Sequence, residues 1–159
     1  MKSLIRIENK IFPKNVKSSE IDLFIRNFLS KFNISYSHGT GHGVGNFGDV
    51  HEKYPIISPR SKDVLSNNNL FSIEPGHYEE GKFGLRIENL YVSKITNNNL
   101  KLKNITLVPY ELNLVDWKLI TSFERKYIKK YHLKIFNIFR PRLSRDHKDF
   151  FTKYLINKI

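Results

Sequence analysis

Cysteine is absent from this chain of 159 residues. Disulfide frameworks, zinc fingers and thiol nucleophiles are therefore excluded, and histidine, aspartate and glutamate remain as the side chains able to hold a metal. Long apolar runs are absent as well. Arg6 and Glu8 interrupt the N-terminal stretch before it could form a signal peptide, and no segment approaches the length of a membrane span. A cytoplasmic protein without membrane contact is therefore expected.

Acidic residues are few: 27 Lys and Arg stand against 15 Asp and Glu, which gives a net charge of +12. Such an excess raises the question of a nucleic-acid partner. However, the basic residues near the C-terminus lack a glycine-rich or aromatic RNA-binding signature. We therefore favour a solvated helical face over a nucleic-acid-binding module for Lys126, Lys129, Lys130, Arg140, Arg142 and Arg145.

Apolar spacing predicts helices at both ends of the chain and short strands between them. A stripe of period 3.6 predicts a helix over about 19–32, with Ser19 and Asp22 as its capping residues, and an earlier helix should end near Pro13. Two tail helices are expected on either side of Pro141, around 120–131 and 146–155. Strands are expected over 54–58, 70–73, 85–92 and 100–108, between turns rich in Asn and Gly. This order predicts an α+β fold.

Three short segments carry the residues with the most distinctive chemistry. The segment 38–45 reads HGTGHGVG, and its glycines exclude a helix. Together with Glu74 and Glu88 on two later segments, His42 offers one imidazole and two carboxylates. This donor set suits manganese, cobalt, iron or zinc. Taken singly, each residue is more often structural or solvated, so the donor chemistry alone leaves the metal site open.

Three further residues could assist such a metal. Arg86 shares a strand face with Glu88, because strand side chains alternate with period two. His38 and His51 could donate hydrogen bonds to a substrate carbonyl or a tetrahedral intermediate.

Together, the segments HGTGHGVG (38–45), VHE (50–52), EPG (74–76) and GLRIEN (84–89) resemble the peptidases of the creatinase, or pita-bread, fold. This family includes methionine aminopeptidase, prolidase, creatinase and Xaa-Pro aminopeptidase. The chain is most similar to the long-type Xaa-Pro aminopeptidases, and the resemblance extends through essentially its whole length. It implies that 1–116 is the second half of a pita-bread catalytic domain and that 117–159 is a helical tail.

The resemblance also implies a role for each motif residue. His42, Glu74 and Glu88 would be metal ligands, with Glu88 shared by two ions and Glu74 acting as general base. His38 and His51 would bind substrate and steady the scissile carbonyl. A divalent metal is implied, manganese first and zinc or cobalt as alternatives. The substrates would be peptides with proline in second position, cleaved before that proline.

Arg86 matches an arginine that lies beside the metal carboxylates in this family. The family also uses two aspartates and a further histidine on the N-terminal side of the His38 segment. Here only Asp22 precedes His38, and it falls within the predicted helix. The chain is therefore expected to hold one metal or none, and to be an inactive C-terminal fragment. Alternatively, it complements a separately encoded N-terminal half or a homodimer partner, which would cover its open sheet edges.

Overall fold

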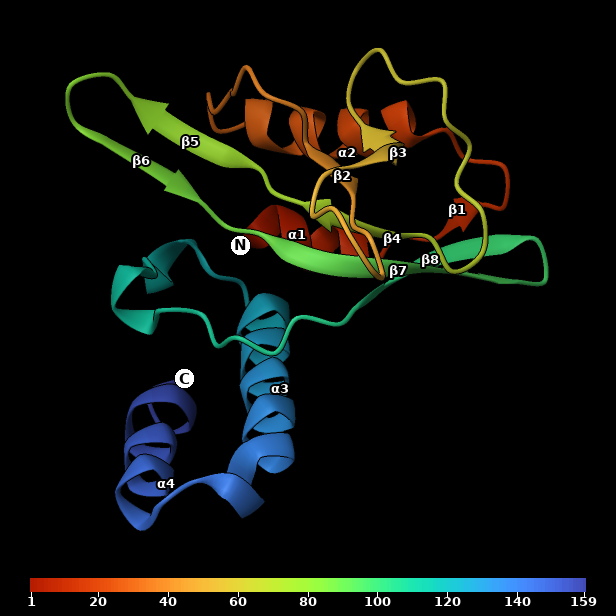
Figure 1. Cartoon of the computed structure of the whole chain (residues 1–159). Helices are drawn as coiled ribbons and strands as arrows, with labels where there is room; N and C mark the ends of the chain where they lie inside the picture. The colour runs from red at the N-terminus through yellow and green to blue at the C-terminus, as the bar shows by residue number, and fades with distance from the viewer. The chain divides into compact units, whose positions relative to one another are not determined.

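The computed structural model describes residues 1–159 and divides into two compact units, Met1–Thr106 and Leu107–Ile159 (Figure 1). The division between Thr106 and Leu107 lies ten residues before the predicted domain boundary at 116/117. That boundary stays a prediction. No helix of either unit combines the length and the apolar character needed to cross a bilayer.

Unit 1 contains two helices and two antiparallel sheets. The helices are α1, Lys2–Glu8, and α2, Ser18–Ser30. A six-stranded sheet has the order β1-β8-β7-β4-β2-β3, and β5 pairs with β6 in a separate ribbon. The strands are β1 Phe12–Pro13, β2 Gly41–Gly43, β3 Glu52–Ile57, β4 Leu70–Ile73, β5 Gly76–Glu79, β6 Phe83–Arg86, β7 Asn89–Thr96 and β8 Asn99–Asn104.

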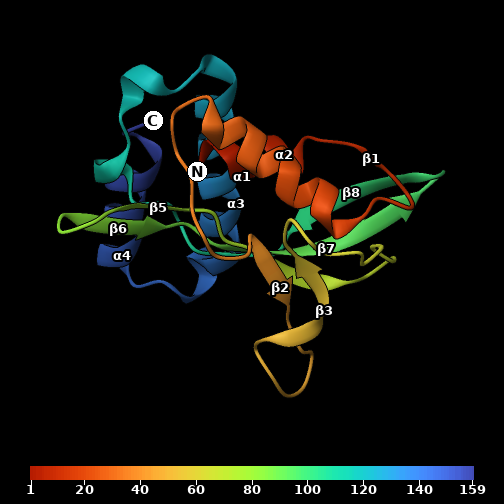
Figure 2. The same cartoon turned by 90° about the horizontal axis from the view of Figure 1, so that it is seen from above.

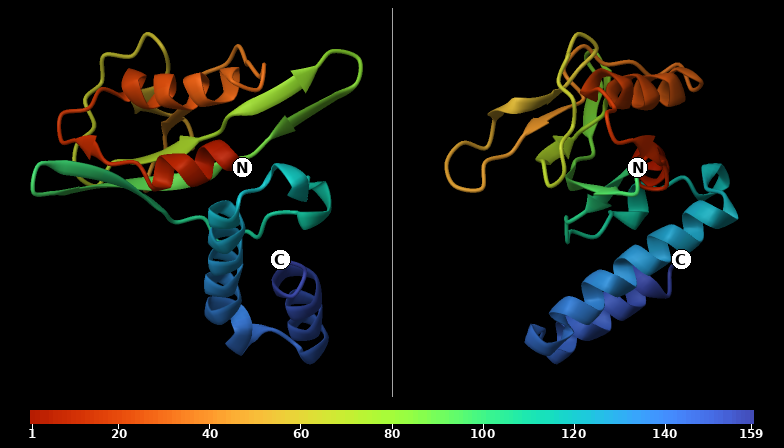
Figure 3. Two further views of the ribbon diagram at one scale, coloured as in Figure 1. Left: turned by 180° about the vertical axis from the view of Figure 1, so that it is seen from behind. Right: turned by 90° about the vertical axis from the view of Figure 1, so that its right-hand side faces the viewer.

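The core of unit 1 lies between its helices and one face of the six-stranded sheet (Figure 3). Ile21 and Ile25, one helical turn apart on α2, are fully buried and confirm the apolar stripe that predicted this helix. Beneath them, Phe71 of β4 and Tyr91 of β7 are also fully buried. The helices therefore fix the strands that carry the motif residues.

The β4–β7 pair and the β5–β6 pair, which lie on either side of Glu74, share one pairing register. Ile73 faces Asn89 at the end of the β4–β7 pair, and Gly76 faces Arg86 at the start of the β5–β6 pair. The expected single strand over 85–92 is wrong, because it is interrupted at 87–88. Opposite this gap stands Pro75, which has no N–H to continue the ladder. The β5–β6 hairpin continues beyond the main sheet (Figures 1 and 2).

Three predicted element boundaries also differ from the structure. The second helix begins at Ser18 rather than Ser19, and Glu20 rather than Asp22 accepts the hydrogen bond of the capping residue, Lys17 N–H. The first helix ends at Glu8, well before Pro13. Strand β8 ends at Asn104 rather than near 108, because the Asn104 side chain accepts a hydrogen bond from the Thr106 N–H at 2.8 Å and turns the chain.

Unit 2 is helical, which confirms both predicted tail helices. Helix α3 spans Ser122–Phe139 and begins with a capping box, in which Thr121 and Glu124 each accept the other's backbone N–H. Helix α4 spans Arg145–Phe151 and continues as a π-helical turn, Thr152–Ile156. Three 3₁₀ turns complete the unit, at Leu112–Leu114, Trp117–Leu119 and Arg140–Arg142.

Contacts of Phe136 and His132 connect α3 to the rest of unit 2. The rings of Phe136 and Phe151 lie 5.2 Å apart between α3 and α4. His132 is fully buried, and its Nε2 accepts the Tyr110 N–H at 3.0 Å. Its Nδ1 must therefore donate to the Leu155 carbonyl, 2.8 Å away. The six basic residues considered above are all exposed in this unit.

Candidate metal centre

The centre of the site is a contact between His42 and Glu74. His42 lies in β2, which is flanked by β4 and β3, and Glu74 directly follows β4. Strand β2 approaches β4 so closely that any side chain at Gly41 would overlap the backbone of Ser72. The Glu74 N–H donates to the Thr40 carbonyl at 2.7 Å. As a result, His42 Nε2 lies 3.3 Å from Glu74 Oε1.

The hydrogen bonds of His42 determine what its Nε2 presents to Glu74. Nδ1 lies 2.8 Å from the Gly43 carbonyl, which can only accept, so Nδ1 carries the proton. A neutral ring with its proton on Nδ1 would direct the Nε2 lone pair at a carboxylate oxygen, whereas a protonated ring would form an ion pair with it. Two lone pairs at this distance repel each other unless a proton or a metal cation lies between them. The pair therefore has the donor chemistry of a cation site.

Two neighbours hold the carboxylate of Glu74, whose side chain is only 10% exposed. The Ser72 hydroxyl accepts the His42 N–H at 3.0 Å and donates to Glu74 Oε1 at 3.1 Å. Arg86 Nη1 donates to Glu74 Oε2 at 3.0 Å. Arg86 therefore lies beside the carboxylate, as expected for an arginine adjacent to a metal ligand, and both oxygens are oriented before any ligand binds.

Tyr78 connects Arg86 to His38. Arg86 Nε donates to the Tyr78 hydroxyl at 2.9 Å, and this hydroxyl lies 2.9 Å from His38 Nε2. His38 Nδ1 donates to the Gly39 carbonyl, so Nε2 accepts the Tyr78 proton. A side chain at Gly76 would overlap the Tyr78 ring, so glycine in the segment EPG makes room for this tyrosine.

His51 completes the histidine group. It is the last residue of the β2–β3 loop, and its ring stacks on that of His42, with the centroids 4.0 Å apart and the planes at 30°. The structure thus gathers five of the six predicted site residues: His38, His42, His51, Glu74 and Arg86.

Glu88 is the predicted site residue that the structure does not bring into this group. Its backbone lies opposite Glu74, because the Ile73–Asn89 pairing and the hydrogen bond from Ile87 N–H to the Pro75 carbonyl flank both residues. Facing residues of antiparallel strands have Cβ atoms about 5 Å apart. The Glu88 side chain is nevertheless exposed, and the chain holds no group of three His, Asp or Glu side chains arranged to bind a metal. The predicted convergence is therefore observed for two of its three members.

Sequence reasoning missed two residues of the site, Ser72 and Tyr78. Ser72 is a fully buried hydroxyl in the otherwise apolar strand LFSI, which is a detectable signal for a polar role. Tyr78 lies two residues beyond Gly76 and four beyond Glu74, so strand periodicity could have placed it on the same face.

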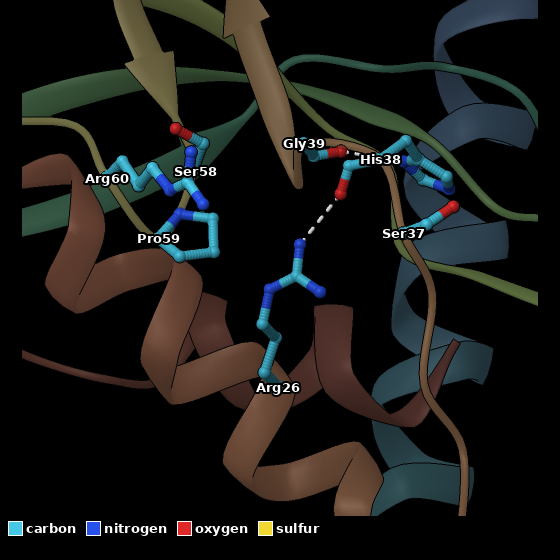
Figure 4. Close-up of a pocket in the computed structure, with 7 residues that line it drawn as sticks. All are labelled: Arg26, Ser37, His38, Gly39, Ser58, Pro59 and Arg60. Carbon is cyan, nitrogen blue, oxygen red and sulfur yellow. Dashed lines mark hydrogen bonds between the residues drawn. The ribbon is translucent and has the colours of Figure 1, made fainter.

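A pocket of about 420 Å³ opens beside His38 (Figure 4). The pocket is lined by Arg26, Ser37, His38, Gly39, Ser58, Pro59 and Arg60. Arg26 comes from α2 and points at the backbone of the His38 segment (Figure 4). His38 therefore contributes both to the hydrogen-bonded group around Glu74 and to the wall of this pocket.

Two family models match nearly the whole chain. The model of metallopeptidase family M24 matches residues 1–94, and the model of the C-terminal region of peptidase M24 matches residues 98–158. A probable Xaa-Pro aminopeptidase P of Arthroderma gypseum is 41% identical over 157 residues, covering 92% of this chain and 25% of that protein. An uncharacterized peptidase of Schizosaccharomyces pombe is 36% identical, covering 97% and 28%. The chain thus spans about a quarter of the length of these curated relatives.

Solved structures of similar proteins share this fold. The X-prolyl aminopeptidase of Caenorhabditis elegans, described as a cytosolic enzyme with a di-nuclear active site, is 30% identical and has a TM-score of 0.85. The match covers 97% of this chain and 27% of that enzyme. The prolidase of Thermococcus sibiricus is 33% identical, with a TM-score of 0.52, over 64% of this chain and 26% of its own. The α+β architecture is the C-terminal part of the pita-bread fold, followed by tail helices.

Proposed function

The chain belongs to metallopeptidase family M24, and from this premise we propose that its residues form part of a metal-dependent aminopeptidase site for peptides with proline in second position. The contact between His42 Nε2 and Glu74 Oε1 at 3.3 Å carries the proposal, because two lone-pair donors face each other there. The names of the relatives support the substrate class, since they include Xaa-Pro aminopeptidases.

His42, Glu74 and Glu88 would hold the metal. One imidazole and two carboxylates suit manganese, with zinc or cobalt as alternatives. A rotation of the exposed Glu88 side chain towards the facing Glu74 would add the third ligand. A divalent cation bound there polarises a carbonyl and makes a water more acidic.

The protein's own groups would carry the proton during hydrolysis. Glu74 would accept a proton from the attacking water and return it to the proline nitrogen as the peptide bond breaks, which leaves a free carboxylate and a free imino group. His51 would donate a hydrogen bond to the scissile carbonyl as it gains negative charge. His38 would do the same once the substrate displaces Tyr78 and the ring proton lies on Nε2 rather than Nδ1. Arg86 would orient the Glu74 carboxylate by donating a hydrogen bond to Oε2 at 3.0 Å.

Full activity would need further ligands, supplied by another part of a larger enzyme in the cytosol. Two metal ions cannot be held by three ligands alone, so this chain alone would have negligible turnover. The β5–β6 hairpin supports such an assembly, because Phe83 and Leu85 are 51% and 43% exposed. A complementing half would bury more than about 2,000 Å² in total, as obligate interfaces do.

A chimera tests this function. The chain would replace the matching quarter of the Arthroderma gypseum protein, and the purified chimera would be assayed with manganese on a tripeptide with proline second. We expect cleavage before proline, loss of cleavage in the Glu74→Gln chimera, and no cleavage by the chain alone. A folded, metal-loaded chimera without activity contradicts the proposal.

A further inference from the structure

An ion pair on α2 lies directly beneath the His38 segment. Asp22 and Arg26 are one helical turn apart, and Arg26 Nε donates to both carboxylate oxygens of Asp22, at 3.0 and 2.9 Å. The Asp22 side chain is 1% exposed and that of Arg26 is 25% exposed. Removing two charges from water costs free energy, so such a pair contributes little to stability compared with apolar residues of similar volume. Its other contacts indicate what it does.

The other two guanidinium nitrogens of Arg26 donate hydrogen bonds to the backbone of the His38 segment. Nη1 donates to the Tyr36 carbonyl and Nη2 to the His38 carbonyl, each at 2.7 Å, and Figure 4 shows the second bond. The guanidinium carbon also lies 4.2 Å from the centre of the Tyr36 ring. One planar group thus joins three acceptors in a fixed geometry, which the ammonium of lysine cannot reproduce.

Asp22 holds the next part of the same segment. Its Oδ1 accepts the hydroxyl proton of Thr40, which is fully buried. Because that proton goes to Asp22, the bond between the Tyr36 and Thr40 hydroxyls must be donated by Tyr36. The Thr40 carbonyl in turn accepts the Glu74 N–H at 2.7 Å. The carboxylate therefore connects α2 to the backbone between His38 and His42.

We infer that Asp22 and Arg26 act as a positioning pair, which presents His38 to Tyr78 and aligns its segment with Glu74. The catalytic meaning of this inference rests on the proposed role of His38, whereas the placement of the ring can be measured directly. Arg26 itself reaches backbone carbonyls, so it acts through His38 rather than on a substrate. Loss of the Arg26 guanidinium should release the 36–38 backbone, while strands β7 and β8 in the core of the sheet stay formed.

The test is NMR spectroscopy of the metal-free chain. In the parent chain we expect a nuclear Overhauser effect between the rings of His38 and Tyr78, whose centroids are 5.6 Å apart. Arg26→Lys should abolish it and shift the carbonyl carbon resonances of Tyr36 and His38, which lose the guanidinium hydrogen bonds, with the amide protection of β7–β8 unchanged. Arg6→Lys is the matched control, because Arg6 lies over the Phe28 ring at 4.6 Å and has no part in this network.

Two further variants keep the result decisive. If Arg26→Lys does not fold, Asp22→Asn combined with Arg26→Gln leaves no unpaired buried charge and should show the same loss. In Arg26→Ala, added methylguanidinium should restore the ring contact, which a purely structural loss of stability would not allow. A retained ring contact and unchanged carbonyl resonances of Tyr36 and His38 overturn the inference. None of these readings requires metal or hydrolysis, so a failure of the proposed function would be seen separately.

Discussion

Replacing Glu74 by glutamine should remove metal binding while leaving the fold in place. The substitution keeps the shape of a side chain that is 10% exposed and deletes its charge. Two charge-assisted hydrogen bonds are weakened, from Ser72 at 3.1 Å and from Arg86 at 3.0 Å. Because the Arg86 side chain is 45% exposed, solvent screens its pair, which is worth at most about 1 kcal/mol.

A new contact with His42 should offset part of this loss of stability. In the parent chain Nε2 lies 3.3 Å from Glu74 Oε1, and glutamine can present an N–H to the Nε2 of a neutral ring there. The gain from this new hydrogen bond is about 1 kcal/mol and offsets much of the loss. We therefore expect a net change in unfolding free energy within about 1 kcal/mol, which shifts Tm by no more than roughly 4 °C for a chain of this size.

Bound metal should change the Tm of the parent chain more than the substitution itself does. At a free concentration of about 100 Kd, a bound ion stabilises the folded state by about 2.7 kcal/mol, which raises Tm by roughly 5–10 °C. A thermal melt with and without manganese should show this rise for the parent chain and none for Glu74→Gln. Glu79→Gln is the matched control, since Glu79 pairs with Lys82 at 2.9 Å on the exposed hairpin. Equal rises in the parent chain and in Glu74→Gln would refute the reasoning.

Three other changes have defined outcomes. Burial lowers the pKa of His132, opposed by its hydrogen bond to the Leu155 carbonyl, so the unfolded chain binds the proton more tightly. The contribution of His132 to the free energy of unfolding should therefore be fully present above its unfolded pKa of about 6.5 and decline as the pH falls below it. His132→Gln should flatten this pH dependence in thermal melts from pH 8 to 5. Glu88→Gln should change stability by less than about 0.5 kcal/mol, because the side chain is exposed, yet weaken manganese binding in a titration. Tyr78→Phe should lower kcat of the chimera roughly 10–100-fold by removing the donor to His38, with little change in Tm.

The sequence predicted the elements whose signals are local. The helix over 19–32 was recognisable because Ile21 and Ile25 share one buried face. The resemblance of the glycine-bounded motifs to the pita-bread peptidases likewise implied that His42 and Glu74 belong to one site. The helix thus follows from periodicity, whereas the grouping of these two residues follows from the resemblance.

Features that depend on competing long-range contacts were not predictable. Asp22 has the spacing of a helix cap, but tertiary structure uses it to bind Arg26 and Thr40 instead. The break at 87–88 depends on Pro75, which lies across the ladder rather than nearby in sequence. Tyr78 acquires its role only because Arg86 and His38 arrive from different strands. Pattern reasoning along one segment cannot detect such pairings.

The most direct test of the metal site is anomalous diffraction at the manganese absorption edge from crystals of the chain soaked in manganese. We expect one anomalous peak within about 2.0–2.2 Å of His42 Nε2 and a Glu74 oxygen, with the Glu88 carboxylate turned towards it. A peak at other residues, or none between His42 and Glu74 at saturating manganese, would contradict it.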